Sequence, residues 1–293
     1  MATKTKRFRQ LLQQPGAFIV PGAYDAMTAR LVEEVGFSAV YATGAGISNA
    51  RLGWADVGLT TLTEIVDIVS RIADVTSIPI IADADTGYGN AVNVIRTVRE
   101  FERAGVAAIQ IEDQVSPKKC GHFSGKQVID KEEMVYKIKA AVDARVDEDL
   151  AIIARTDALA VSGIEEALER AAAYREAGAD ILFVEAPTTL EEMERIGRTF
   201  RDVPLVLNLV EGAKTPLVSL EEAERMGFKI VLCANTALRA AIKAVRETLE
   251  LLQVHRSQIP LLDRICTWEE RQNLFKLHEI EEWERKYLRF EQP

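Results

Sequence analysis

Carboxylate side chains follow several short apolar runs of this 293-residue chain, where they could bind a metal ion. Asp83 and Asp85 follow one run, Glu112 follows a second and Glu185 follows a third. An ionised carboxylate at the buried end of a strand is costly unless it is paired or bound to a metal. Oxygen donors without a neighbouring His or Cys favour Mg²⁺ or Mn²⁺ over Zn²⁺.

The residues around these acids indicate whether their role is structural or chemical. In the structural interpretation, the acids cap a helix and pair with Arg155. Gly87 and Gly89 follow closely, however, and glycines let the backbone approach a ligand. This pattern favours a metal site.

A second group of reactive side chains lies within residues 116–126. Lys118, Lys119, Cys120, Gly121 and His122 are consecutive there. Nearby cations favour the thiolate form of a cysteine, and they can also hold a carboxylate. The alternative is a solvated basic loop with an incidental cysteine. Because the five residues come directly after a run that ends in Glu-Asp-Gln, we favour a chemical role.

The other cysteine and histidine residues carry no predicted chemistry. Cys233 lies in an apolar run and is expected in the core, and we assign Cys266 no role. His255 and His278 lie in charge-rich helical stretches and are expected at the surface. The chain has three cysteines, and an odd number does not indicate a disulfide framework.

Eight short apolar runs, many rich in Val and Ile, are each followed by a loop and a segment with helical periodicity. Because their hydrophobicity is continuous rather than alternating, the runs are typical of parallel strands buried on both faces. The predicted strands are residues 17–20, 39–42, 78–82, 107–111, 151–154, 181–184, 204–207 and 230–233.

The helix signals between the runs agree with this alternation. Capping boxes of the form Ser/Thr-x-x-Glu begin at Thr61, Ser162, Thr189 and Ser219. Eight strands that alternate with helices predict an α/β fold, a closed (β/α)₈ barrel of TIM type with its active site at the carboxyl ends of the strands. An open doubly wound sheet is the competing architecture, but no G-x-G-x-x-G motif follows the first strand.

Length and charge narrow the class of protein further. A length of ~150 residues per domain would give two domains, but a TIM-type barrel of ~250 residues is one. We predict a single domain over residues 1–293, of which residues 235–293 form a helical segment that packs on a neighbouring subunit. The formal net charge of −9 argues against nonspecific binding to nucleic acid or to an anionic membrane.

The sequence also bears on location. No apolar stretch is long enough to span a membrane. Residues 1–14 are basic and polar and lack the apolar centre of a signal peptide. We therefore expect a cytoplasmic protein.

Several motifs resemble those of the isocitrate lyase/phosphoenolpyruvate mutase superfamily. The similarity runs from Pro21-Gly-Ala-Tyr-Asp25 to the tail, and it includes Asp83-Ala-Asp-Thr-Gly-Tyr-Gly89, Ile111-Glu-Asp-Gln114 and Ala154-Arg-Thr-Asp-Ala158. Lys118-Lys-Cys-Gly-His122 is similar to the signature of the superfamily's carbon–carbon lyases, whereas its phosphonate-forming mutases lack that cysteine. The resemblance implies a barrel whose last helix is exchanged between subunits, usually in a homotetramer.

The resemblance also implies roles for individual residues. The residues implied to bind the metal, Mg²⁺ or Mn²⁺, are Asp83, Asp85 and Glu112. The implied catalytic residues are Cys120 as the acid, Tyr41 as the base, Lys119 and His122. The implied contacts to a small carboxylate substrate are Thr43, Gly44, Ala45, Gly121, Arg155, Glu185, Asn208 and Arg239.

The implied reaction is a metal-dependent cleavage of the C2–C3 bond of a 2-hydroxy di- or tricarboxylic acid. Its products are a 2-oxo acid such as pyruvate and a second carboxylic acid. The alternatives on the same fold are an oxaloacetate hydrolase or decarboxylase and a carboxyphosphonoenolpyruvate mutase. A noncatalytic barrel is a further alternative, and the intact set of acids, Cys120 and Arg155 argues against it.

The residues that would select the substrate resemble those of two different groups of lyases. Methylisocitrate lyases of the superfamily have Asn-x-Thr where this chain has Asn208-Leu-Val210, and their tail arginine falls on Trp268. Arg271 lies one helical turn away and could replace that arginine. Glu185-Ala-Pro187 and residues 211–216 instead resemble the lyases of 2-alkylmalates and 2,3-dimethylmalate.

Overall fold

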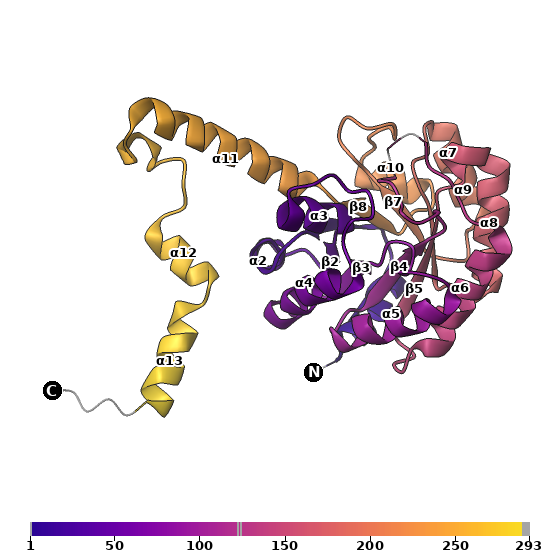
Figure 1. The fold of residues 1–293 in the computed structure, drawn as a ribbon, viewed down its shortest axis with the longest axis horizontal. Coiled ribbons are helices and arrows are strands. Elements are labelled where there is room, and N and C mark those ends of the chain that lie inside the picture. The colour runs from indigo at the N-terminus through magenta and orange to yellow at the C-terminus, as the bar shows by residue number, and fades with distance from the viewer. Residues whose placement is uncertain (1, 122, 124, 289–293) are drawn as a thin grey trace. The chain divides into compact units, whose positions relative to one another are not determined.

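The computed structural model describes residues 2–121, 123 and 125–288 and divides the chain into two compact units, residues 1–238 and 239–293. In the described part of the first unit, eight parallel strands form a closed barrel in sequence order (Figure 1). The predicted (β/α)₈ barrel is therefore confirmed. The strands are β1 (Phe18–Ala23), β2 (Val40–Ala42), β3 (Ile80–Asp83), β4 (Ala108–Glu112), β5 (Ala151–Thr156), β6 (Ile181–Val184), β7 (Leu205–Asn208) and β8 (Ile230–Cys233).

Each predicted strand overlaps an observed one, and two of them, at residues 181–184 and 230–233, have the predicted bounds. The largest difference is in β1, which continues three residues beyond its prediction, through Pro21 and Gly22. Pro21 pairs in register with Cys233, which closes the barrel between β1 and β8. A Cβ at Gly22 would collide with the backbone of Ala234, so this close approach requires glycine.

Helices surround the barrel (Figure 1). The capping boxes at Thr61 and Ser219 are present, and the Thr189 hydroxyl accepts a hydrogen bond as an N-cap. The prediction at Ser162 is wrong, because Ser162 ends a short helix and Gly163, with φ 86°, is the N-cap residue of the next one. The helices are α2 (Ala26–Val35), α3 (Gly44–Leu52), α4 (Leu62–Val75), α5 (Ala91–Arg103), α6 (Lys131–Ala144), α7 (Leu159–Ser162), α8 (Ile164–Glu176), α9 (Leu190–Thr199) and α10 (Leu220–Arg225).

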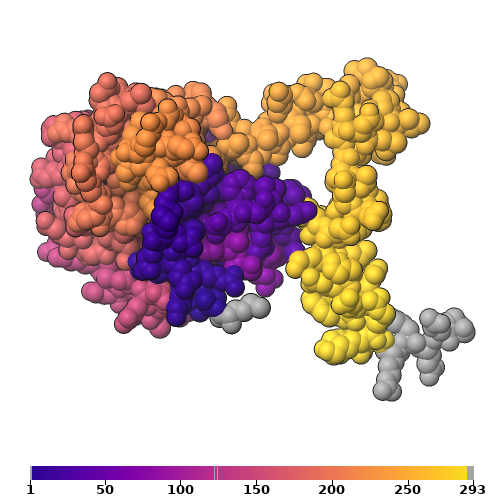
Figure 2. Space-filling model, turned by 180° about the vertical axis from the view of Figure 1, so that it is seen from behind, coloured from indigo at the N-terminus to yellow at the C-terminus, as the bar shows by residue number. Residues whose placement is uncertain are grey.

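The N-terminal helix α1 (Lys4–Gln13) contributes to the interior of the barrel. Phe8 is fully buried in the same cluster as the inward-facing residues of the strands. Ala39, Ala107 and Ala151, at the amino ends of β2, β4 and β5, belong to this cluster, and their small side chains leave room for the ring. Figure 2 shows the N-terminal segment, in indigo, lying against the rest of the first unit.

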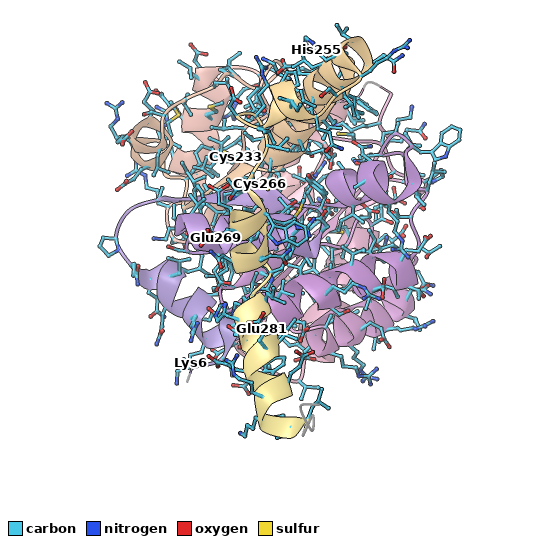
Figure 3. All side chains as sticks on the ribbon, turned by 90° about the vertical axis from the view of Figure 1, so that its left-hand side faces the viewer. Lys6, Cys233, His255, Cys266, Glu269 and Glu281 are labelled. Carbon is cyan, nitrogen blue, oxygen red and sulfur yellow. The ribbon has the colours of Figure 1, made fainter. Side chains whose placement is uncertain are left out.

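The second unit, residues 239–293, contains most of α11 (Thr236–His255), then η1 (Ile259–Leu261), α12 (Trp268–Leu274) and α13 (Leu277–Tyr287). Among its described residues, Leu261 is the one buried side chain. Large apolar side chains such as Leu249 and Trp283 are exposed in it. His255 and Cys266, labelled in Figure 3, are exposed as well. The described residues of this segment therefore build almost no core of their own.

A search of the described residues for a helix both long and apolar enough to cross a membrane finds none.

Replacing Phe8 tests whether α1 is part of the barrel core. Phe8→Ala should lower the free energy of unfolding by about 3–5 kcal/mol, because it removes a buried ring and leaves a cavity. Denaturant unfolding followed by circular dichroism measures this change. Val35→Ala is the control, because Val35 is 73% exposed and its change should stay within about 0.5 kcal/mol. Equal effects of the two substitutions would contradict the packing of Phe8.

Candidate active site

Polar side chains from most of the strands meet at the carboxyl ends of the barrel around one cavity. This follows from the topology, because all eight parallel strands point their carboxyl ends to the same rim. The predicted site residues that line the cavity are Tyr41, Thr43, Ala45, Asp83, Cys120, Gly121, Arg155, Glu185 and Asn208.

Asp83, the last residue of β3, is held by three donors. Its Oδ1 accepts hydrogen bonds from the backbone N–H of Asp85, at 3.0 Å, and from Nε2 of Gln110, at 3.2 Å. Its Oδ2 accepts the N–H of Gly44, at 3.3 Å, and a Cβ at Gly44 would lie only 2.8 Å from that oxygen. The start of α3 therefore needs a glycine to pack against Asp83.

Asp85 lies in the turn after β3 with φ 46°, a backbone conformation that is unusual for a residue other than glycine. Such strain persists where the surroundings impose it, and it is frequent at functional sites. Glu112, at the end of β4, accepts a hydrogen bond from Gln114 Nε2 at 3.0 Å, and Arg155 Nε lies 3.3 Å from its other oxygen. All three predicted metal-binding acids are buried at one rim.

Lys118, rather than Lys119, faces these acids. Lys118 Nζ lies 2.6 Å from Asp56 Oδ1 and 2.8 Å from Asp85 Oδ1, and its side chain is buried. Lys119 is exposed, and its Nζ donates to the carbonyl oxygen of Gly125 at 3.0 Å. The predicted catalytic role of Lys119 stays a prediction. Asp56 was not predicted, since no motif in the sequence marks it.

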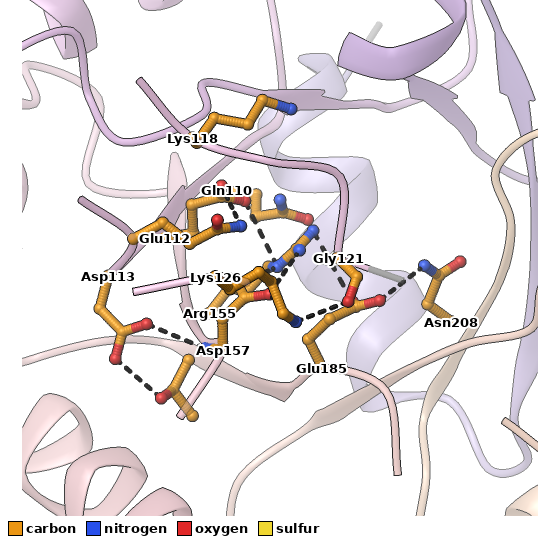
Figure 4. Close-up of polar contacts among 12 residues, drawn as sticks. Gln110, Glu112, Asp113, Lys118, Gly121, Lys126, Arg155, Asp157, Glu185 and Asn208 are labelled. Atoms are coloured by element: carbon orange, nitrogen blue, oxygen red, sulfur yellow. Dashed lines mark hydrogen bonds and ion pairs between the residues drawn. The ribbon is translucent and has the colours of Figure 1, made fainter. Parts of the chain in front are cut away.

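Arg155 is the central cation of the site (Figure 4). Its Nε and Nη2 donate to the two carboxylate oxygens of Asp157 at 2.9 and 3.1 Å, and its Nη1 lies 3.7 Å from Glu185 Oε2. Burial opposes the charge, but Asp157, Glu112 and Glu185 together raise the pKa of Arg155 above its usual value. The guanidinium also lies over the ring of Phe183, 5.3 Å from its centre. Arg155 is thus a fixed, permanently charged group in the cavity wall.

Tyr41 is buried, and its hydroxyl donates to Gln110 Oε1 at 2.9 Å. Burial, followed by the charge of Asp83, raises the pKa of Tyr41 well above its usual value. A phenolate base at this position therefore needs a neighbouring cation. Gln110 was not predicted, although it shares the inward face of β4 with Glu112, two residues away.

The remaining predicted residues lie at the edge of the site or outside its description. Cys120 is half-buried, and its backbone N–H donates to the carbonyl oxygen of Asp56 at 3.2 Å. His122 lies outside the described residues. Arg239 begins the second unit. In that unit the guanidinium of Arg271 stacks on the ring of Trp268, 4.2 Å from its centre.

The charge balance at the site fits a divalent cation. Among the described residues, seven acids but only five bases are buried. The acids are Asp56, Asp83, Asp85, Glu112, Asp113, Asp157 and Glu185, and the bases are Lys118, Lys126, Lys137, Arg155 and Arg170. Burial is the main cause that raises the pKa of Asp85 to about 6 and that of Glu112 well above its usual range. An added positive charge would relieve both carboxyl groups.

The arrangement of the acids limits how such a cation would be held. Asp85 Oδ1 and Glu112 Oε2 are buried carboxylate oxygens whose contacts are ion pairs, with Lys118 Nζ at 2.8 Å and with Arg155 Nε at 3.3 Å. The described residues contain no cluster of three acidic, His or Cys side chains arranged around one point. Mg²⁺ usually takes one or two protein carboxylates and completes its shell with water and substrate oxygens. The described acids at the rim therefore fit an ion that also binds water and substrate oxygens, and they do not form a site in which every ligand comes from the protein.

Comparisons with known proteins agree with this geometry. The profile of the phosphoenolpyruvate phosphomutase family matches residues 8–253. A 2,3-dimethylmalate lyase from Eubacterium barkeri is 49% identical over 281 residues, which cover 96% of this chain and 97% of that protein. A 2-methylisocitrate lyase from Aeropyrum pernix is 46% identical over 273 residues, which cover 93% and 87% of the two chains.

Solved structures show the same fold. A crystal structure of 2,3-dimethylmalate lyase, described as a member of the PEP mutase/isocitrate lyase superfamily, aligns with a TM-score of 0.92 at 40% identity over 98% of this chain and 96% of that one. A phosphonopyruvate hydrolase in complex with oxalate and Mg²⁺ aligns with a TM-score of 0.89 at 33% identity over 98% of this chain and 100% of that one.

The raised pKa of Asp85 predicts a pH dependence of stability in the metal-free protein. The folded protein holds a proton on Asp85 up to about pH 6, whereas an unfolded Asp releases it near pH 4. Stability should therefore fall as the pH rises from about 4 to 6, by about 1–3 kcal/mol. Asp85→Asn should remove this component, as measured by denaturant unfolding in EDTA at pH 4.5 and 7.5. Asp143→Asn, which changes an exposed acid of α6, should keep it, and an unaltered slope in Asp85→Asn would contradict the assignment.

Proposed function

The chain belongs to the phosphoenolpyruvate mutase/isocitrate lyase superfamily, and from this membership we propose that it is a carbon–carbon lyase. The proposed reaction cleaves the C2–C3 bond of a 2-hydroxy di- or tricarboxylic acid to a 2-oxo acid such as pyruvate and a second carboxylic acid. The observation that carries the proposal is that Cys120 and Gly121 line the same cavity as Asp83 and Arg155. The proposed proton donor thus lines the same cavity as one of the proposed metal-binding acids and a fixed cation.

The residues divide the work of the reaction. A Mg²⁺ or Mn²⁺ ion held by Asp85, with Asp83 and Glu112 around it, would lower the pKa of the substrate hydroxyl. Tyr41 is the proposed base that takes the hydroxyl proton. The electron pair of the C2–C3 bond remains on C3, and the thiol of Cys120 then donates a proton to that carbon.

Other residues orient the substrate and stabilise its charge. Arg155, held by Asp157, would pair with a substrate carboxylate and with the negative charge that develops on the leaving fragment. Thr43, Gly44 and Ala45 begin α3, where backbone N–H groups favour an anion. The further proposed contacts are Gly121, Glu185, Asn208 and Arg239, with Lys119 and His122 near the developing charge.

The cavity wall supports an alkyl-substituted substrate. Val210, Leu232 and Phe183 line the cavity beside Asn208, and apolar side chains favour an alkyl group over a third carboxylate. We therefore propose a 2,3-dialkylmalate as the preferred substrate and 2-methylisocitrate as the next candidate. A tricarboxylate would need a further cation, for which we propose Arg239.

We propose a homo-oligomer, with a tetramer as the expected form. The support is the second unit, whose described residues bury one side chain while exposing large apolar ones. A segment that buries so little apolar surface is stable only against another protein surface. We propose that residues 235–293 pack on a neighbouring subunit and that the protein works in the cytoplasm.

A substrate screen with and without metal tests the proposed function. Racemic 2,3-dimethylmalate, 2-methylisocitrate and citramalate, together with oxaloacetate and carboxyphosphonoenolpyruvate, are incubated with Mg²⁺ or with EDTA. Consumption of each compound and release of 2-oxo acid, oxalate and CO₂ are measured. We expect 2-oxo acid from a dialkylmalate with Mg²⁺ and none with EDTA. Asp85→Ala should lower kcat by at least ~10²-fold, as expected when electrostatic stabilisation is lost.

Each other outcome of the screen has a defined meaning. Oxalate or CO₂ from oxaloacetate without cleavage of the malates would favour the hydrolase or decarboxylase. Turnover of a carboxyphosphonate alone would favour the mutase, and no turnover of any compound would favour a noncatalytic barrel. Full activity in EDTA would overturn the metal site.

Replacing the proposed proton donor tests its role directly. Cys120→Ser should fold normally but lose about 10²–10⁴ in kcat, because a hydroxyl is a much weaker acid than a thiol. Cys266→Ser is the matched control, since Cys266 is exposed in the second unit, and its kcat should be unchanged. Near-normal kcat in Cys120→Ser would remove the thiol from the mechanism.

A further inference from the structure

Lys126 has its ammonium group buried although its neighbours along the chain, Gly125 and Gln127, are exposed. The side chain of Lys126 is 1% exposed. Its Nζ donates to the carbonyl oxygen of Gly121 at 2.5 Å and to Asp157 Oδ1 at 2.7 Å (Figure 4). Burying a lysine is unfavourable unless its charge is paired, so these two acceptors account for its position.

The carboxylate that pairs with Lys126 is the one that holds Arg155. Asp157 Oδ1 accepts both Lys126 Nζ and Arg155 Nη2, and its Oδ2 accepts Arg155 Nε. Burial opposes ionisation of Asp157, but Arg155 and Lys126 together lower its pKa to about 2. The backbone N–H of Asp157 donates to Asp113 Oδ1 at 2.9 Å, and this hydrogen bond fixes the backbone of Asp157. One carboxylate therefore connects a loop lysine to the cation in the cavity wall.

The other acceptor of Lys126, the carbonyl of Gly121, belongs to a residue that packs against the cavity wall. A Cβ at Gly121 would overlap with Arg155 Nη2 and would lie 2.6 Å from Glu185 Oε1. The backbone at Gly121 is thus packed directly on two side chains of the cavity wall, and Cys120 precedes it. The hydrogen bond from Lys126 holds the Gly121 carbonyl in this position.

We propose that Lys126 is a positioning residue that couples the Cys120–Gly121 backbone to the Asp157–Arg155 pair. One ammonium group then sets both the placement of the thiol and the orientation of the guanidinium. The expected effect on turnover rests on the proposed lyase function, whereas the placement of Cys120 can be measured without any substrate.

The variant Lys126→Met tests this coupling by removing the ammonium while keeping a chain of similar length. Alkylation by iodoacetamide is followed at each cysteine by peptide mass spectrometry, with exposed Cys266 as the internal reference. We expect alkylation of Cys120 relative to Cys266 to rise by about tenfold, in keeping with the loss of a hydrogen bond to a charged group. We expect kcat to fall by a similar factor. Lys139→Met, at an exposed lysine of α6, should change neither.

Two results would overturn the proposal. The first is a folded Lys126→Met protein whose Cys120 reacts at the wild-type rate. The second comes from the wild type, where Lys126 should react with an amine reagent at least about tenfold more slowly than exposed Lys119 if its charge is held as described. Equal labelling of the two lysines would contradict the buried pairing, and this measurement applies even if no variant of Lys126 folds. If Cys120 responds as expected but no substrate is turned over, the lyase function fails and the positioning role stands.

Discussion

Burial of more acids than bases at one rim of the barrel is the constraint on which the rest of the site depends. Each carboxylate there has lost its water and needs a positive charge, a hydrogen-bond donor or a proton in return. Lys118 lies between Asp56 and Asp85, and Arg155 lies between Asp157 and Glu112. These pairs neutralise only part of the charge, and this remaining charge supports the divalent cation that we propose for the rim.

A second layer of contacts holds this rim from the helices. Asp113 accepts hydrogen bonds from the hydroxyls of Thr156 and Tyr174, both at 2.7 Å, and from Arg170 at 3.3 Å. Its other oxygen accepts the N–H of Asp157. Strands β4 and β5 and helix α8 are therefore joined beneath the site by one buried carboxylate. Such a fully bonded network keeps Arg155 in one orientation, which a transition-state contact requires.

Two buried lysines, one near each end of the segment 116–126, attach this segment to the rim. Lys118 pairs with Asp56 and with Asp85, which follows β3, and Lys126 pairs with Asp157, which follows β5. Both lysines pair with acids that belong to the site. The ion pairs that neutralise the rim therefore also hold the segment that carries Cys120. A substitution that changes the charge of the rim is thus expected to affect the loop as well.

Local patterns in the sequence were enough to predict the barrel, the approximate place of each strand, and Asp83, Asp85, Glu112 and Glu185 at the rim. Continuous apolar runs report burial on both faces, and a parallel barrel brings every residue that follows such a run to the same end. The prediction failed at Ser162, where the motif fits a capping box but a short helix ends instead. A local motif cannot show whether a residue ends one helix or caps the helix that follows.

The sequence by itself determined the fold and the kinds of group at the site, because hydrophobic periodicity and residue type are local properties. Only the tertiary structure decided which of two adjacent lysines faces the acids, since Lys118 is selected by Asp56, a residue 62 positions away that no motif marks. It also decided that Lys126 is buried and that Gln110 connects Tyr41 with Asp83. The direction of a side chain in a loop depends on long-range charge pairing, and that pairing exists only once the strands have closed into the barrel.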